Sequence, residues 1–544
     1  MGVRDIFFIG VLMGGVATLS AGFPRSSQPH RTSNPTDPAA RTLAEADAAR
    51  DVVAIVAQVN ERLRQRRDKQ HATASGPASE LAAMRRASLA LAGSIPSLEQ
   101  VREFEALPEG ARVDRWIDAL LADRRCADYL SERFARVYVG TEDGPFLVFR
   151  RRRFTTWLSD AILENRPYSL IVRDLIAADG LWMDHPSTNF VTVTHTEATG
   201  RPDPERLAAR TSRAFLGIRL DCAQCHDHPF QNWKQADFRG LAAFYGGVHA
   251  NLRGIHDGAC DYQPVDRTTK QPTPVAPRVP FLSEILPAEG SPRARLAAWI
   301  VDPRNPHLAR ATVNRVWALL LGRPLVEPID DIPAAGDPAG ILAALADDFA
   351  AHDYNLHRLI RTIAAADAFR VDSASAAADG PSDDDVETWA AFPLTRLRPE
   401  QVAGSLFQAG SVATLGPRSP WLLRFMAYTG GNEFVKRFGD TGEDEFDARG
   451  GTIPQRLLLM NGDLVQSKTK EDLFNASARI AMQAPADAQA VEVAYLAVLT
   501  RRPTAEEAAH FVKKLEGTRG DTRKRILADL FWTLVNTTEF SWNH

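Results

Sequence analysis

Apolar positions recur at helical spacing along most of the chain. In "DVVAIVAQVNERLRQRR" the apolar residues Val52, Ile55, Val56, Val59 and Leu63 fall every three or four positions, which is the period of one helix face. The same period continues in "ARVDRWIDALLAD", "DYLSERFARVYV", "FTTWLSDAILEN", "YSLIVRDLIAAD" and, much later, "ARATVNRVWALLLG" and "RKRILADLFWTLVN". The pattern predicts a mainly α protein.

Polar residues mark where some of these helices begin. In "IPSLEQVREFEAL", Ser97 stands three residues before Gln100, which is the signature of a capping box. The basic run 150–153 predicts a solvated helix start. Strand signals are scarce, and "NFVTVTHT" (189–196) is the best strand candidate.

Breaks in the periodicity suggest how the chain is organised. Residues 264–282 are rich in proline and aperiodic. We therefore expect two helical regions with long loops, 46–263 and 281–544, joined by a proline-rich connection at 264–280. Residues 23–45 are rich in Pro, Ser, Thr and Arg and predict a flexible lead.

Composition places the chain among ordinary globular proteins. It has 544 residues, too many for one compact core. Apolar residues make up 44% and charged residues 24%. The net charge of −4 results from 64 basic and 68 acidic side chains, so the charge gives no reason to expect nucleic acid or an anionic membrane as a partner.

The first 22 residues have the layout of a secretory signal. Arg4 precedes an almost wholly apolar run at 6–20, and the small residues Ala21 and Gly22 follow it. The run is shorter than the roughly 20 residues that a spanning helix needs. We expect an exported protein, periplasmic or at the cell surface, with no further membrane span. An uncleaved anchor stays an alternative, because Leu19 is a poor residue before a cleavage site.

Two of the four cysteines stand three residues apart in "GIRLDCAQCHDHPFQNW" (217–233), with a histidine directly after them. Cys222 and Cys225 match the spacing that attaches haem c through two thioethers, and His226 is placed to bind the iron. The sequence therefore predicts one covalent haem held by these three residues. Met183, His185, His195, His249 and His256 are the nearest candidates for a sixth iron ligand.

Two other interpretations of the same cysteines stay open. Cys222 and Cys225 could form a structural zinc site with His256 and Cys260 of "HDGAC", since Cys-x2-Cys and His-x3-Cys supply four soft or borderline ligands. His226 and His228 compete as zinc ligands. A disulfide within the CxxC is the remaining alternative.

No catalytic constellation is visible in the sequence. It contains no GxSxG, HExxH, P-loop or strand-linked GxGxxG, so enzyme status stays open. The acidic clusters "VEPIDDIP" (326–333) and "DTGEDEF" (440–446) lack EF-hand spacing and predict solvated loops.

Several stretches resemble a known pair of domains. "FLGIRLDCAQCHDHPFQNWKQADFRGLAAFYGGV" and "WIDALLADRRCADYLSERFARVYVG" are similar to DUF1549 (PSCyt2), a cytochrome-like domain of exported planctomycete proteins. "LAAWIVDPRNPHLARATVNRVWALLLGRPLVEPIDDI" and "GTIPQRLLLMNGDLV" resemble DUF1553 (PSD1), which follows it.

The resemblance implies haem at Cys222, Cys225 and His226, and a redox role tied to extracellular polysaccharide use. Its partners would be redox proteins or surface glycan-degradation proteins. The chain has no second CxxCH, so at most one haem is expected. The alternative is a non-haem exported binding or scaffold protein with a structural zinc site.

Overall fold

The structure of the protein is a computed structural model. It describes residues 38–544 except 142–143, 146–147, 198, 266–269, 334–335, 375–381, 417–418, 440–445 and 447–450. The predicted signal at 1–22 and most of the predicted lead lie outside the described residues. The chain forms two compact units, Met1–Asp51 and Val52–His544, and nearly all of the described residues belong to the second.

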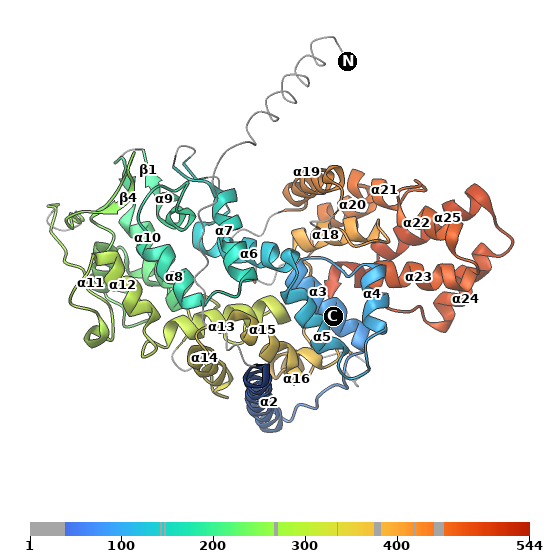
Figure 1. The fold of residues 1–544 in the computed structure, drawn as a ribbon, viewed down its shortest axis with the longest axis horizontal. Coiled ribbons are helices and arrows are strands. Elements are labelled where there is room, and N and C mark those ends of the chain that lie inside the picture. Colours follow the sequence, from blue (N-terminus) through green and yellow to red (C-terminus); the bar gives the residue numbers. More distant parts are fainter. Residues whose placement is uncertain are drawn as a thin grey trace, which may run out of the picture. The chain divides into compact units, whose positions relative to one another are not determined.

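Helices make up most of the described chain, which confirms the predicted mainly α class (Figure 1). Up to residue 257 the helices are α2 (Pro38–Lys69), α3 (Glu80–Ala92), α4 (Leu98–Glu105), α5 (Arg112–Leu121), α6 (Arg124–Val139), α7 (Arg151–Leu163), α8 (Tyr168–Ala177), η1 (Pro186–Thr188), α9 (Asn189–Thr192), α10 (Pro204–Thr211), η2 (Ser212–Leu216), η3 (Leu220–Ala223) and α11 (Gln235–Ala243). Helix α2 begins inside the segment predicted as a flexible lead.

The later part of the chain is also helical. Its helices are η4 (Ser283–Ile285), α12 (Pro292–Val301), α13 (His307–Leu321), α14 (Ile341–Ala351), α15 (Leu356–Ala365), α16 (Asp367–Arg370), α17 (Asp383–Glu387), α18 (Pro399–Ala409), α19 (Trp421–Phe438), α20 (Ile453–Asn461), α21 (Asp463–Thr469), α22 (Ala476–Gln483), α23 (Asp487–Leu499), α24 (Ala505–Leu515), α25 (Gly520–Val535) and η5 (Glu539–Ser541).

The strands of the described residues form antiparallel pairs. They are β1 (His195–Thr196) with β2 (Arg201–Pro202), β3 (Val248–Asn251) with β4 (Gly254–Asp257), and β5 (Thr395–Arg396) with β6 (Trp542–Asn543).

The strand predicted at 189–196 is wrong over its first half, because residues 189–192 form helix α9. All four of these residues are buried, so the alternation of the sequence does not separate two faces. The Asn189 side chain fixes the turn: it accepts a hydrogen bond from the Arg150 backbone N–H at 2.6 Å and donates to the carbonyls of Trp182 and Pro186. These tertiary contacts override the local pattern.

Two helix starts occur where the sequence places them. The Ser97 side chain accepts from the backbone N–H of Gln100, and the Gln100 side chain accepts from that of Ser97, which completes the capping box of α4. Helix α7 begins at Arg151, within the basic run. Both helix starts are confirmed, but the basic run is only partly solvated, because Arg151 is half-buried and pairs with Glu132 at 2.6 Å.

Buried apolar side chains form two cores. The larger core runs from Ile55 to Phe392, with Leu496 added, and includes Tyr262 and Ile285, on either side of the proline-rich connection. The smaller core is built from residues 397–540 together with Leu89 and Ile95. Helices α18 and α21 to α25, orange to red in Figure 1, supply most of the smaller core. Packing is therefore continuous across 264–280, and the predicted domain boundaries stay a prediction.

Helix α13 is the central element of the larger core. All but two of its fifteen residues are buried, as expected of a helix that is covered on every side. It packs against α14 and α15, which follow it, and against α3 and η2, which come far earlier in the chain. This helix thereby joins the two halves of the sequence.

Candidate functional site

The CxxCH segment begins on a short helical turn whose inner side is buried. In η3, Leu220 and Ala223 are fully buried and Cys222 is exposed, and Cys225 and His226, which follow η3, are exposed too. A 3₁₀ turn places side chains three positions apart on the same side, so the two buried residues hold one side of η3 against the core. The reactive side chains are left at the surface.

Ionic contacts from distant residues fix the base of this loop. The Arg219 guanidinium donates to Asp330 at 2.8 Å, and the Gln231 amide donates to Asp331 at 2.9 Å. Asp330 also faces Arg213, which pairs with Asp221. The segment "VEPIDDIP" is a loop, as predicted, but it is only partly solvated, because Asp330 and Asp331 are half-buried and bind the CxxCH segment. Nothing in the local sequence pointed to contacts 100 or more residues away. Of "DTGEDEF", all but the final Phe446 lies outside the described residues.

Asp227, next to the motif, connects the loop to helix α11. Its carboxylate accepts the backbone N–H of Gln235 at 2.9 Å and pairs with Lys234 at 3.1 Å. These contacts, the backbone hydrogen bond first, lower the pKa of the Asp227 carboxyl. The loop is thus held at both ends.

The two histidines of the loop favour different tautomers. His226 Nδ1 lies 2.7 Å from the carbonyl oxygen of Asp227. Because a carbonyl only accepts, Nδ1 must donate, and in the neutral form Nε2 keeps its lone pair. His228 Nδ1 instead accepts from the backbone N–H groups of Phe230 and Gln231, at 3.1 and 2.9 Å, so its proton is on Nε2 in the neutral form. Of the two, His226 is the one prepared to bind a metal through Nε2.

An exposed aromatic ring lies beside the motif. The Phe230 side chain is 93% exposed, which is unusual for a large aromatic residue, and it lies edge-on to His228 with ring centroids 6.4 Å apart. Two thiols and one imidazole with an open Nε2 are the groups that covalent haem attachment uses. The residues present fit haem c.

The cysteines are present as thiols. No disulfide joins Cys222 to Cys225, or either of them to Cys126 or Cys260. Cys126 is buried in α6, and desolvation raises the pKa of its thiol to about 12. It is therefore an inert core residue.

The alternative zinc set is not assembled in the structure. The Cys260 thiol donates to the carbonyl of Ala243, at the end of α11, at 3.3 Å, and His256 faces His249 across the β3–β4 hairpin. Among the described residues there is no group of three or more His, Cys, Asp or Glu side chains placed to hold a metal ion.

The candidates for a sixth iron ligand lie on several elements. Met183 is 46% exposed, after α8. The His185 ring packs over Gly180, and His195 lies in β1. His249 and His256 form a pair with each other.

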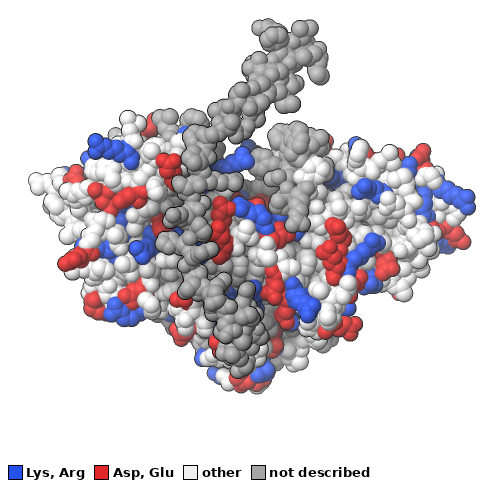
Figure 2. Space-filling view, viewed as in Figure 1, with Lys and Arg blue, Asp and Glu red and all other residues white. Residues whose placement is uncertain are grey.

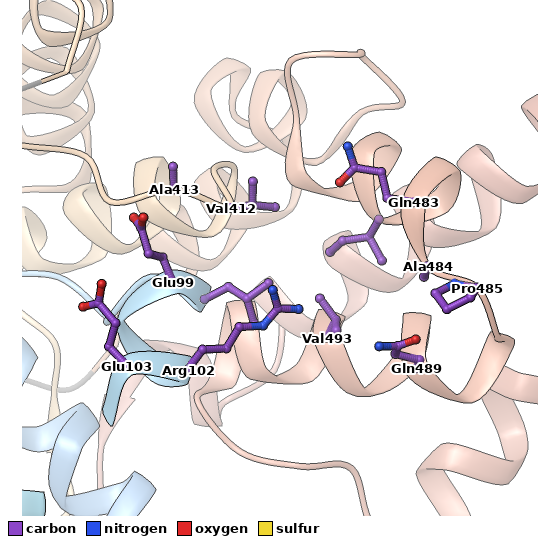
Figure 3. Close-up of a pocket in the computed structure, with 12 residues that line it drawn as sticks. Glu99, Arg102, Glu103, Val412, Ala413, Gln483, Ala484, Pro485, Gln489 and Val493 are labelled. Atoms are coloured by element: carbon purple, nitrogen blue, oxygen red, sulfur yellow. The ribbon is translucent and has the colours of Figure 1, made fainter. Parts of the chain in front are cut away.

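A second concave region, absent from the sequence predictions, lies between α4, α22 and α23. It is a pocket of about 520 Å³, within the usual size range of small-molecule sites. In Figure 3 the Arg102 guanidinium lies between Glu99 and Val493. Glu99 itself accepts hydrogen bonds from Thr414. Because its charged groups are scattered along exposed helix faces, no sequence pattern marked this pocket.

Charges on the molecular surface are mixed. On the face drawn in Figure 2, Lys and Arg alternate with Asp and Glu, in keeping with the near balance of the composition. None of the helices searched in the described part of the chain has the length and apolar content that crossing a membrane requires.

Comparison with known proteins identifies two regions. Residues 58–250 match the family model PSCyt2, a protein of unknown function (DUF1549), and residues 292–420 match PSD1, a protein of unknown function (DUF1553). No curated protein and no solved structure matches the chain significantly. The CxxCH segment lies inside the first matched region and the aspartates that anchor it lie inside the second. The chain is therefore similar to PSCyt2 (DUF1549) over residues 58–250 and to PSD1 (DUF1553) over residues 292–420.

Proposed function

We propose that this protein is an exported, single-haem c-type cytochrome with a role in electron transfer. Cys222 and Cys225 would hold the haem through thioethers, and His226 would bind its iron through Nε2. The signal-like first 22 residues support export. The name PSCyt2 supplies a loose link to cytochromes.

The observation that carries the proposal is the hydrogen bond from His226 Nδ1 to the Asp227 carbonyl. Histidines that bind metals commonly donate their other ring N–H to a carbonyl, which fixes the tautomer and the ring orientation. Here that contact exists within the loop itself. His228, two residues on, has the opposite tautomer and makes a matched internal comparison.

The covalent chemistry balances without an external oxidant. Each thiol adds across one vinyl group, so that a C–S bond forms, the vinyl double bond is lost and the thiol hydrogen goes to the other vinyl carbon. Both thiols are exposed, so porphyrin edges can reach them. When bound, haem supplies one-electron redox chemistry.

Expression with a cytochrome c maturation system tests the proposal. The purified protein should be red, and its haem should remain on the chain through acid–acetone extraction and denaturing gels. Replacing both cysteines by serine should abolish attachment. Cys260→Ser, which leaves the motif intact, is the matched control and should keep the haem.

The histidine assignment has its own comparison. His226→Ala should change the axial ligation seen in the absorption spectrum while some covalent haem remains, and His228→Ala should leave the ligation unchanged. A colourless protein with about one equivalent of zinc, destabilised by chelators, would favour the non-haem binding or scaffold protein with a structural zinc site instead. A colourless, metal-free protein with a 222–225 disulfide would contradict both.

A further inference from the structure

The β3–β4 hairpin places two histidines directly opposite each other. His249 pairs with His256 across the antiparallel strands. Alternation sends neighbouring side chains to the other face, where Val248 and Ile255 are almost fully buried, at 2% and 1% exposure. The histidines are half-buried on the outer face. The hairpin thus has an apolar inner side and an imidazole pair outside.

The two rings are close enough to share a ligand. Their centroids lie 5.5 Å apart and their planes differ by 22°. Side chains directly opposite each other on antiparallel strands have Cβ atoms about 5 Å apart. The rings are stacked, so a side-chain rotation is needed before one nitrogen of each imidazole is directed to the same ion.

One hydrogen bond orients the His256 ring. His256 Nδ1 lies 3.3 Å from the Gly254 carbonyl, so in the neutral form Nδ1 donates and Nε2 keeps its lone pair.

Strand β4, which carries His256, is held in place by contacts on its inner side. Asp257, next to His256, pairs with the fully buried Arg293 of α12 at 2.5 Å. Ile255 exchanges two backbone hydrogen bonds with Gly180, at 2.8 and 2.9 Å. These contacts fix strand β4 from the inner side, so that binding an ion would not require the hairpin to be ordered first.

Gly258 makes room for one of the rings. A Cβ built on Gly258 would lie 2.9 Å from Cδ2 and Nε2 of His249. The backbone at Gly258 has no positive φ, so alanine can adopt its conformation. The contact with the His249 ring is then the main effect of the substitution. Gly258→Ala therefore displaces the ring without removing a ligand.

We propose that His249 and His256 form a two-histidine site for a late divalent transition-metal ion of the Ni²⁺, Cu²⁺ and Zn²⁺ class. Imidazole suits these ions. Since no third His, Cys, Asp or Glu joins the pair among the described residues, the remaining coordination positions fall to water or to an added ligand. This site uses none of Cys222, Cys225 and His226.

The test uses Ni²⁺ as the probe and the full chain without a histidine tag. Cys222→Ser and Cys225→Ser are introduced throughout, so that thiolates do not compete. Isothermal titration calorimetry should show one equivalent bound. His249→Ala and His256→Ala should each weaken binding by about tenfold or more. Once one histidine holds the ion, the other binds it at a high effective concentration, and either substitution removes this advantage. His510→Ala, an exposed histidine on α24, is the matched control and should have no effect.

Two further variants test whether Ni²⁺ binds at the histidine pair or at scattered groups on the surface. Gly258→Ala should weaken Ni²⁺ binding with both histidines present. Arg201→Gln should strengthen it, because a nearby positive charge is removed. Each variant is checked for an unchanged circular dichroism melt in the absence of metal, and His249→Gln replaces any alanine variant that melts early. Binding of equal affinity in the His249→Ala/His256→Ala double variant, or an equal loss in His510→Ala, would overturn the proposal.

Discussion

At the scale of single residues, the surroundings of each histidine decide what it can do. His226 is exposed with an open Nε2, whereas His357 is 9% exposed and its Nε2 lies 2.9 Å from the Ile162 carbonyl. Desolvation, aided by the charge of Arg361, lowers the pKa of His357 to about 4. His357 is therefore neutral in the folded protein at pH values where an exposed histidine is charged.

This shift predicts a loss of stability in acid. Because the folded pKa of His357 is depressed, the unfolded chain takes up its proton first, so stability is present above pH 6.5 and is lost as pH falls toward about 4. The full effect is roughly 3 kcal/mol in the free energy of unfolding. His357→Gln keeps a donor for the carbonyl but does not titrate. Urea unfolding across this range should show a shallower pH dependence in the variant, and parallel curves would contradict the assignment.

The candidate site shows which of its features a sequence pattern can predict. The spacing of Cys222, Cys225 and His226 suggested the site from sequence alone, because the chemistry depends on neighbours in the chain. The tautomers of His226 and His228 depend on backbone groups of the folded loop. The support from Asp330 and Asp331 depends on tertiary contacts. Neither the tautomers nor the aspartate contacts can be predicted from the spacing of residues in the sequence.

At the scale of elements, helices were predictable and the short extended segments were not. Helix signals repeat over many residues and are reinforced by caps such as Ser97. The error at 189–196 arose in a stretch of eight residues, where the buried Asn189 makes three hydrogen bonds to other segments. Periodicity is informative only where a segment is long enough to show one exposed face.

The cap of α4 gives a prediction at this scale. Ser97 is 1% exposed, accepts the Gln100 backbone N–H at 3.0 Å, and its hydroxyl lies 2.8 Å from that of Thr414. Ser97→Ala should lower the free energy of unfolding by about 1 to 2 kcal/mol, measured in urea. Ser97→Thr, which keeps the hydroxyl, should recover part of the loss. An alanine variant as stable as the parent would show that the cap contributes nothing.

At the scale of the whole molecule, one buried arginine connects three distant segments. Arg86 of α3 is fully buried and donates to the carbonyls of Phe369, Val371 and His544, at 2.9, 2.7 and 2.8 Å. Its guanidinium also lies 3.7 Å from the centre of the Phe392 ring. Desolvation lowers its pKa to about 9, so it remains charged at neutral pH.

Removing this arginine should be costly. Arg86→Met leaves the buried carbonyls of Phe369 and Val371 and the partly buried His544 oxygen without this donor, and we expect a loss of about 3 kcal/mol or more in the free energy of unfolding. Arg64→Met is the matched control: Arg64 is exposed and pairs with Glu61 alone among the described contacts, so its loss should cost about 0.5 kcal/mol or less. Equal effects of the two variants would refute the role of Arg86.

The position of α13 predicts that the first half cannot fold by itself. A fragment of residues 52–291 lacks this helix, whose buried residues pack on α3 and η2, and would expose the apolar surface that α13 covers. We expect such a fragment to lack a cooperative thermal transition and to be cleaved rapidly by trypsin. A sharp melt of the fragment would show instead that the region matching PSCyt2 is an autonomous domain.

The surface position of Cys222 and Cys225 bears on the order of events during biogenesis. Leu220 and Ala223 are buried in the core, whereas Cys222 and Cys225 are exposed beside them. If haem is attached here, the attachment enzymes can reach both thiols without opening the core, so attachment need not precede folding.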